Sequence, residues 1–317
     1  MLSRVADSVL WMARYVERAE NLARFIDVTL NLQIDLPHAG GEQWAPLISA
    51  TGDQKAFKER HGEIATDRNV IDFLTFDREN PSSIISVLRA ARENARSIRE
   101  TISSETWEQL NAFYHFVRDA DPDEVRRSPG EFFHAVKNHS HLFNGVTDGT
   151  MSHGEGWHFL NVGRRLERAD KTSRILDVKY FTLLPHVSDV GGPVDDLQWS
   201  AVLRSVSGFE MFRKRYHLIT VERVVDFLIL DRQFPRAIQH CLIQANASLH
   251  KISGSSTGGF VNLAEQRLGR LQSDLAYRDV RSIIDQGLHE FVDSLQTQLN
   301  QVGDAITETF FDPLPTA

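Results

Sequence analysis

The chain has 317 residues, which is enough for two ordinary domains or one large helical unit. Its 43 acidic residues outnumber its 35 lysines and arginines, and the resulting net charge of -8 argues against nucleic-acid binding. Apolar residues at 41% and charged residues at 25% exclude wholesale disorder. The single cysteine, Cys241, excludes an intrachain disulfide and a cysteine-rich metal site, and it fits a reducing compartment.

The sequence contains neither a predicted membrane-spanning helix nor a predicted signal peptide. No apolar run approaches the ~18 residues that a membrane-spanning helix needs. Near the N-terminus, Asp7, Arg14, Glu17 and Arg18 interrupt the uncharged segment that a signal peptide requires. We therefore expect a cytoplasmic protein that binds neither membranes nor nucleic acid.

Apolar residues near the N-terminus recur at alternating steps of four and three residues, which is the pattern of a heptad seam. This pattern predicts a long helix that packs nearly parallel to a neighbour, as in helical bundles. Similar stepping begins again at Phe159 and continues to Tyr180. The first seam consists of Val5, Val9, Met12, Val16, Ala19, Ala23, Ile26 and Leu30.

The rest of the chain also favours helices, so the predicted fold class is all-α. Glycine and proline predict breaks at 38–41, 121–123, 191–193 and 254–259. Pro81 and Pro235 stand where a new helix can begin, because proline is tolerated at the first helical position. The further helices are predicted over 42–61, 67–79, 81–97, 99–119, 129–146, 194–216, 219–232, 235–251, 259–277 and 279–307.

Two blocks of sequence occur twice, in the same order. Residues 13–28 match residues 163–178 at 7 of 16 positions, with an offset of 150. Residues 70–95 match residues 224–249 at 10 of 26 positions, with an offset of 154. Unrelated segments would match at about one position in fifteen. We therefore predict an internal duplication, with related helical bundles at 1–150 and 151–317 packed as one compact unit.

A Glu-Arg-Ala sequence lies beside the apolar seam of each long helix. Arg18 falls on a stripe that is otherwise apolar or aromatic, so it needs a carboxylate partner other than the adjacent Glu17. We predict that the motif residues of both copies converge and line a polar pocket for a carboxylate or phosphate group. The other stripe residues are Trp11, Tyr15, Leu22 and Phe25. The candidate ligand-binding residues are Arg14, Glu17, Arg18, Arg164, Glu167 and Arg168.

Other interpretations stay open at this stage. The motif pairs also fit a structural network that braces neighbouring helices. The secondary candidates Asp77, Arg78, Asp231 and Arg232 also fit helix corners that the aspartates close. Five histidines cluster in the middle of the chain, but no HExxH spacing occurs, so we predict neither a metal site nor a cofactor. These histidines are His134, His139, His141, His153 and His158.

Several segments resemble the bacterial alpha-E family. They are LSRVADS at 2–8, WMARYVERAEN at 11–21, EGWHFL at 155–160, GRRLERAD at 163–170 and DRQFP at 231–235. The resemblance covers essentially the whole chain and implies an all-helical protein whose Glu-Arg motif falls on 17–18 and 167–168. It also implies partners: a circularly permuted ATP-grasp ligase, a transglutaminase-like cysteine peptidase homologue and, in some gene neighbourhoods, the proteasome-like peptidase Anbu.

The resemblance implies a role in peptide ligation or peptide modification without supplying an established reaction. Our first hypothesis is a helical partner of an ATP-grasp-type amide ligase, in which Arg18 and Arg168 clamp an anion and Glu17 and Glu167 orient them or grip an amine. A second hypothesis is a stand-alone enzyme with a glutamate as general base, although no nucleophile–base pair is visible. A third is a purely structural scaffold. The sequence leaves open the catalytic residues, the substrate and a homo-oligomeric state.

Overall fold

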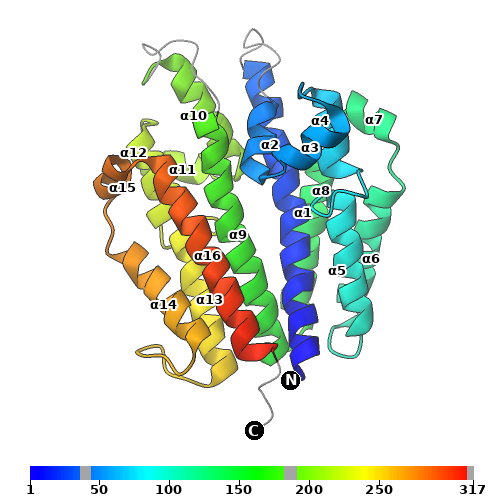
Figure 1. Ribbon diagram of the computed structural model, residues 1–317, viewed down its shortest axis with the longest axis vertical. Coiled ribbons are helices and arrows are strands. Elements are labelled where there is room, and N and C mark those ends of the chain that lie inside the picture. The colour runs from blue at the N-terminus through cyan, green and yellow to red at the C-terminus, as the bar shows by residue number, and fades with distance from the viewer. Residues whose placement is uncertain (36–43, 182–190, 313–317) are drawn as a thin grey trace.

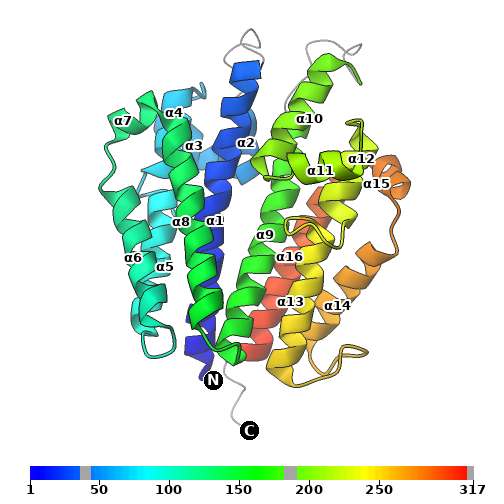
Figure 2. The same cartoon turned by 180° about the vertical axis from the view of Figure 1, so that it is seen from behind.

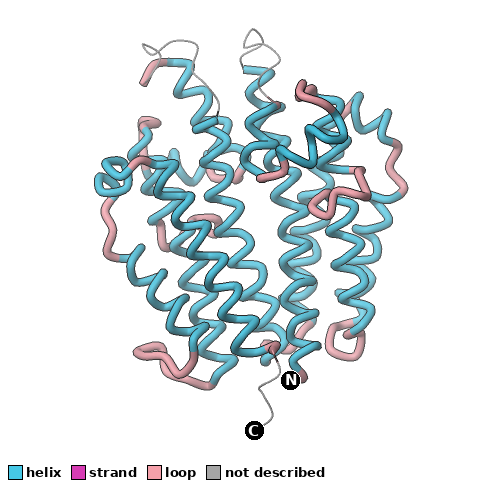
Figure 3. Tube along the Cα trace, in the orientation of Figure 1, coloured by secondary structure: helices cyan, strands magenta, loops and turns pink. Residues whose placement is uncertain are grey.

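The computed structural model describes residues 1–35, 44–181 and 191–312. Within these ranges the chain forms sixteen α-helices and one π-helical turn, and it forms no strand. Figure 3 shows helices joined by loops in the described part of the chain. The predicted all-α fold class is therefore confirmed. None of the described helices combines the length and the apolar character that crossing a membrane requires.

The helices fall into two series with the same order of long and short members. The first series is α1 (Ser3–Asp35), α2 (Ala45–Thr51), α3 (Gln54–His61), α4 (Asp67–Thr75), α5 (Ile84–Ser97), α6 (Ser104–Arg118), α7 (Pro122–Arg127) and α8 (Pro129–Thr150). The second is α9 (Glu155–Phe181), α10 (Pro193–Ser205), α11 (Phe209–Arg215), α12 (Val221–Val225) with the π-helical turn η3 (Asp226–Leu230), α13 (Ile238–Ser253), α14 (Leu263–Ala276), α15 (Val280–Gln286) and α16 (Leu288–Phe310). This order supports the predicted duplication, which itself stays a prediction.

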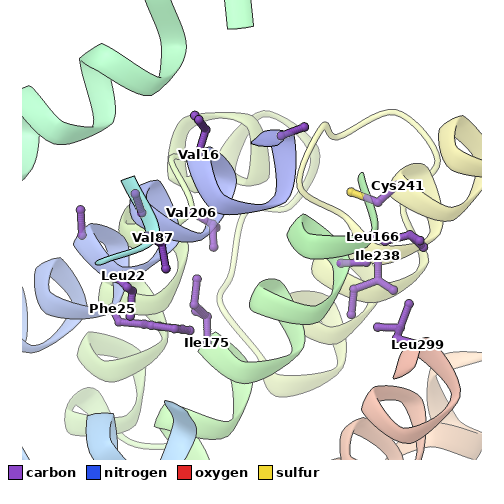
Figure 4. Packing of buried hydrophobic residues seen from close by; sticks show 14 of the residues in the cluster. Val16, Leu22, Phe25, Val87, Leu166, Ile175, Val206, Ile238, Cys241 and Leu299 are labelled. Carbon is purple, nitrogen blue, oxygen red and sulfur yellow. The ribbon is translucent and has the colours of Figure 1, made fainter. Parts of the chain in front are cut away.

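The two long helices α1 and α9 lie against each other at the centre of the molecule (Figure 1). Most of their seam residues are almost fully buried, including Val9, Val16 and Leu166. The backbones approach closely where Gly163 faces α1, since a Cβ atom there would collide with the carbonyl oxygen of Leu10. Figure 4 shows part of the surrounding apolar core, to which α1, α5, α9, α13 and α16 contribute. The heptad seams therefore hold the two halves together.

The remaining helices cover this central pair in a corresponding way. On one side α5 and α8 pack against α1, and on the other α13 and α16 pack against α9. The short helices cross over: α2 of the first series packs against α9, and α10 of the second packs against α1. Each half therefore covers part of the long helix of the other half.

Three predicted helices are each divided in two. Gly52 (φ +79°) separates α2 from α3, and Gly287 (φ +95°) separates α15 from α16. Ser207 (φ +52°) lies between α10 and α11. A residue in the left-handed region ends an α-helix, so the predictions of single helices over 42–61, 194–216 and 279–307 were wrong.

Prolines mark different positions from those predicted. The helices after Pro81 and Pro235 begin three residues later, at Ile84 and Ile238, because a turn intervenes. The predicted break at 121–123 contains the start of α7, whose first residue is proline and whose N-terminus is capped by the preceding aspartate. The predicted break at 38–41 lies outside the described residues.

Candidate functional site

The Glu-Arg sequences of α1 and α9 bind each other reciprocally. Arg18 donates from Nε to Glu167 Oε1 (2.6 Å) and from Nη2 to Oε2 (3.1 Å). Arg168 donates from Nε to Glu17 Oε1 (2.8 Å) and from Nη2 to Oε2 (2.7 Å). Such fork-on-carboxylate pairs are among the strongest side-chain interactions. The carboxylate that the sequence required for Arg18 is thus supplied by the other half of the chain.

Both motif glutamates are sealed from solvent and fully ionised. Glu17 and Glu167 have 0% of their surface exposed. Burial by itself raises the pKa of Glu167, but Arg18, Lys171 and Arg14 together lower that pKa well below the ordinary value. Burial likewise raises the pKa of Glu17, yet the net shift is downward because Arg168 and Arg236 outweigh it. Both oxygens of each carboxylate accept hydrogen bonds from guanidinium groups.

More cations gather around Glu167 than the motif alone predicts. Arg14 donates from Nε to Glu167 Oε2 (2.9 Å), and its guanidinium lies 4.6 Å from the ring centre of Trp11. The ammonium of Lys171 lies 3.6 Å from Glu167 Oε1 and 2.7 Å from a carboxylate oxygen of Asp170. The side chain of Arg14 remains 20% exposed, so this side of the network reaches solvent.

The network around Glu17 contains an arginine that sequence reasoning missed. Arg236, from the turn before α13, donates to Glu17 Oε1 (3.3 Å) and Asn21 Oδ1 (3.0 Å) and also binds Glu20. Glu20 in turn accepts from Arg24 Nη2 (2.7 Å), as the i,i+4 spacing predicts. Burial raises the pKa of Glu20, but Arg236 and Arg24 bring it well below its ordinary value.

One feature of the sequence distinguishes Arg236. In the matched blocks, Arg236 stands where the first copy has Ser82. A charged residue that only one copy carries, one position after the shared proline, marks a place where the copies differ in chemistry. Its partner could not be read from the sequence, because Arg236 reaches α1 from a turn more than 200 positions away.

Arg164, the remaining primary candidate, lies outside the Glu17 network. It donates to Asn144 Oδ1 (3.2 Å) and Asn161 Oδ1 (2.9 Å), both of them neutral amides. Only 8% of its surface is exposed. Burial first, and then the nearby Arg165, lowers the pKa of Arg164 to about 10.

The secondary candidates lie at the turns that lead into α5 and α13. Asp77 accepts from the backbone N–H groups of Glu79 (2.9 Å) and Asn80 (3.3 Å), and Arg60 binds it as well (2.6 Å). Asp231 has the equivalent role in its own turn, where Gln233 and Phe234 donate from the backbone. The adjacent Arg78 and Arg232 are exposed. This geometry favours the helix-corner interpretation of these residues.

Motif residues do not line either of two grooves on the described surface. One of about 750 Å³ lies between α6, α7 and α8, and one of about 420 Å³ lies between α14 and α16. Across residues 1–35, 44–181 and 191–312, no group of three or more histidine, cysteine or acidic side chains is placed to hold a metal ion.

Comparison with known families finds one that is characterised by the same Glu-Arg sequence. Residues 1–311 match the Alpha-E family, which is described as a predicted alpha-helical domain with a conserved ER motif. The chain belongs to the Alpha-E family. In this Alpha-E chain, the ER sequences at 17–18 and 167–168 are the ones whose side chains pair across the α1–α9 contact.

Three curated relatives are similar to this Alpha-E chain over most of its length. They are uncharacterized proteins, one from Mycobacterium bovis and two from strains of Mycobacterium tuberculosis. Each is 24% identical over 330 residues, and the alignment covers 96% of this chain. The Alpha-E chain spans only 36% of the length of each relative. No solved structure matches it.

Proposed function

We propose that this chain is a helical partner of an ATP-grasp-type peptide or amide ligase system, in which it binds a carboxylate- or phosphate-bearing group. The resemblance of residues 2–21 and 155–170 to alpha-E proteins supports this association, because their genes neighbour or fuse to such ligases. Each curated relative has almost two thirds of its length outside the aligned region.

The observation that carries the non-catalytic part of this proposal is the reciprocal pairing of Glu17 and Glu167. A general base needs a pKa near the working pH and access to the proton that it removes. Both glutamates have a lowered pKa and no exposed surface. These properties disfavour the alternative of a stand-alone enzyme with either glutamate as its base.

The sealed pairs favour a second candidate function as well, that of a purely structural scaffold. Buried charge networks that fix one helix against another are suited to this role. The two candidates differ in one measurable respect. A partner that binds the carboxylate- or phosphate-bearing group changes the turnover of the ligase, whereas a scaffold that does not bind this group needs only to associate with the ligase.

The test is reconstitution with the purified cognate ATP-grasp protein. We expect the chain to co-purify with the ligase and to change the rate of ATP-dependent amide-bond formation several-fold at equimolar concentration. An unrelated helical protein at the same concentration is the control, and the transglutaminase-like protein is a second binding target. Binding without a change in turnover would favour the scaffold, and absence of both effects would contradict the proposal.

A further inference from the structure

The two halves place an arginine at the same position of their long helices, with opposite results. Arg14 and Arg164 are matched in the repeated blocks at an offset of 150. Arg14 donates to the carboxylate of Glu167 and packs over Trp11. Among the residues that the structure describes, Arg164 donates only to the amide oxygens of Asn144 and Asn161, and its buried Nε has no hydrogen-bond partner. One guanidinium has a carboxylate partner, and its counterpart has neutral amide partners.

The reason for this difference lies in the occupancy of Glu17. By analogy with the Arg14–Glu167 pair, Glu17 is the carboxylate that Arg164 would use. Glu17 is instead bound by Arg168 through both oxygens, and Oε1 also accepts from Arg236. Arg236 thus occupies the carboxylate oxygen that Arg164 would have used, and Arg164 is left with neutral amide partners.

The guanidinium of Arg165 adds a second positive charge beside Arg164. Arg165 donates from Nε to Asn161 Oδ1 (3.2 Å), the same oxygen that Arg164 Nη2 contacts at 2.9 Å. Tyr15 stands at the matched position in the first half. Burial and the neighbouring Arg168 lower the pKa of Arg165. A buried and a partly buried cation that converge on one amide oxygen are unfavourable unless an anion joins them.

The surroundings of this pair contain further polar groups from three helices. Asn161 donates from Nδ2 to Ser248 Oγ (2.8 Å) on α13, and His158 Nδ1 lies 3.2 Å from that hydroxyl. Asn144 belongs to α8, which together with α13 flanks α9 in the view of Figure 2. Arg165 and Asn144 are partly exposed, so solvent reaches the edge of the cluster.

We propose that Arg164 and Arg165, together with the amides of Asn144 and Asn161, bind a phosphoryl group between α8, α9 and α13. A phosphate monoester carries a charge of about −1.5 to −2 at pH 7, which suits two neighbouring guanidinium groups without a directly bound carboxylate, and its oxygens accept several N–H donors. The inference rests on the proposed function in that it gives the anion-binding role a location and a ligand class. That location is beside the Glu-Arg pairs and not within them.

Binding of inorganic phosphate to the full chain tests this site without any ligase. We expect phosphate to raise the melting temperature at constant ionic strength, relative to chloride, and to give a measurable heat of binding. Arg165→Gln should weaken phosphate binding tenfold or more. The same substitution should leave the melting temperature in chloride unchanged or higher, because it removes like-charge repulsion. This combination separates a binding role from a structural one.

Two further variants complete the experiment. Arg270→Gln is the matched control, because Arg270 is a well-exposed arginine on α14, with 83% of its side chain accessible, and this variant should bind phosphate as the parent chain does. Asp148→Asn should bind phosphate more tightly, because Asp148 is an exposed carboxylate on α8 whose charge acts on both Arg164 and Arg165. An unchanged phosphate affinity in Arg165→Gln would overturn the proposal.

Competing ligands identify the source of the phosphoryl group. Inorganic phosphate, ADP and acetate are compared at equal ionic strength, and tighter binding of ADP than of phosphate would identify a nucleotide as the ligand. Protection by acetate equal to that by phosphate, or no effect of phosphate at all, would overturn the site. If phosphate binds as expected but ligase turnover does not respond to the chain, the proposed function fails while this site stands. The reverse outcome rejects this site alone.

Discussion

At the scale of single residues, the charges at the α1–α9 contact act as mutual constraints. A buried ion pair adds little net stability over a well-packed apolar pair, but removing one partner leaves an uncompensated charge in the interior. Glu167 illustrates this, since Arg14, Arg18 and Lys171 all lie within 4 Å of its carboxylate oxygens. One carboxylate therefore keeps three cations together.

Replacing this carboxylate by a neutral amide should be strongly destabilising. We expect Glu167→Gln to lower the free energy of unfolding by about 3–5 kcal/mol, measured by urea denaturation. Glu63→Gln is the matched control, because Glu63 pairs with Lys58 on the surface with 77% of its side chain exposed. The control should change stability by no more than about 1 kcal/mol. Equal effects of the two substitutions would contradict the role assigned to Glu167.

The same carboxylates should make the fold sensitive to acid. The pKa values of Glu17, Glu20 and Glu167 are lowered in the folded chain, and unfolding returns them to about 4.3. Below that pH the unfolded chain binds more protons than the folded one, so stability falls as the pH falls. We expect these glutamates to contribute a constant amount to the free energy of unfolding above about pH 5, and this contribution to be lost progressively below it. Urea denaturation at several pH values measures this dependence. Glu167→Gln should show a shallower loss, and equal slopes would contradict this expectation.

At the scale of helices, the sequence predicted the long elements well and the short ones poorly. The heptad seams of α1 and α9 predict both helices and their contact, because the spacing of apolar residues is sufficient to indicate a helix and the face that it buries. The interruption at Ser207 (φ +52°) was missed, although the next residue, Gly208, is the N-cap of α11. The pairing of Arg168 with Glu17 was beyond reach as well, because it depends on the axial register of α1 against α9. Arg236 was missed because it enters from a turn and not from either motif helix.

That register makes one glycine a sensitive position. We expect Gly163→Ala to destabilise the chain by about 1–3 kcal/mol, because the added Cβ would collide with the carbonyl oxygen of Leu10 and push α9 away from α1. Gly145→Ala on α8 is the matched control, since nothing lies within 4 Å of its Cβ position. In an open helical position, alanine should stabilise by about 0.5–1 kcal/mol. Opposite signs in thermal denaturation are the expected result, and a neutral Gly163→Ala would contradict the close approach.

At the scale of the whole molecule, the two halves depend on each other. The long helices α1 and α9 pack against each other, and α2 and α10 each cover the long helix of the opposite half. A separated half would expose its apolar seam and one member of each reciprocal ion pair to water. We therefore expect that the predicted boundary near residue 150 separates two related sequences but not two parts that fold independently.

Expression of the halves tests this dependence directly. Residues 1–150 and 151–317, produced separately, should each lack a cooperative thermal transition by circular dichroism, and mixing them should restore one. The control is the full chain cut at a protease site inserted in the turn at 151–154, which should stay folded. A cooperative transition in either isolated half would show that the halves are independent domains.

The reciprocal pairing of Glu17 with Arg168 and of Glu167 with Arg18 has the form of an isologous contact, in which each side gives what it receives. A two-fold homodimer must repeat every such contact identically. A covalently joined pair is released from that requirement, and here Arg236 replaces Ser82 and Arg165 replaces Tyr15 on one side alone. Under the predicted duplication, fusion allows a two-fold pairing to carry different residues on its two sides, so a joined pair can present the proposed cationic site once, where an unlinked dimer would have to present it twice or not at all.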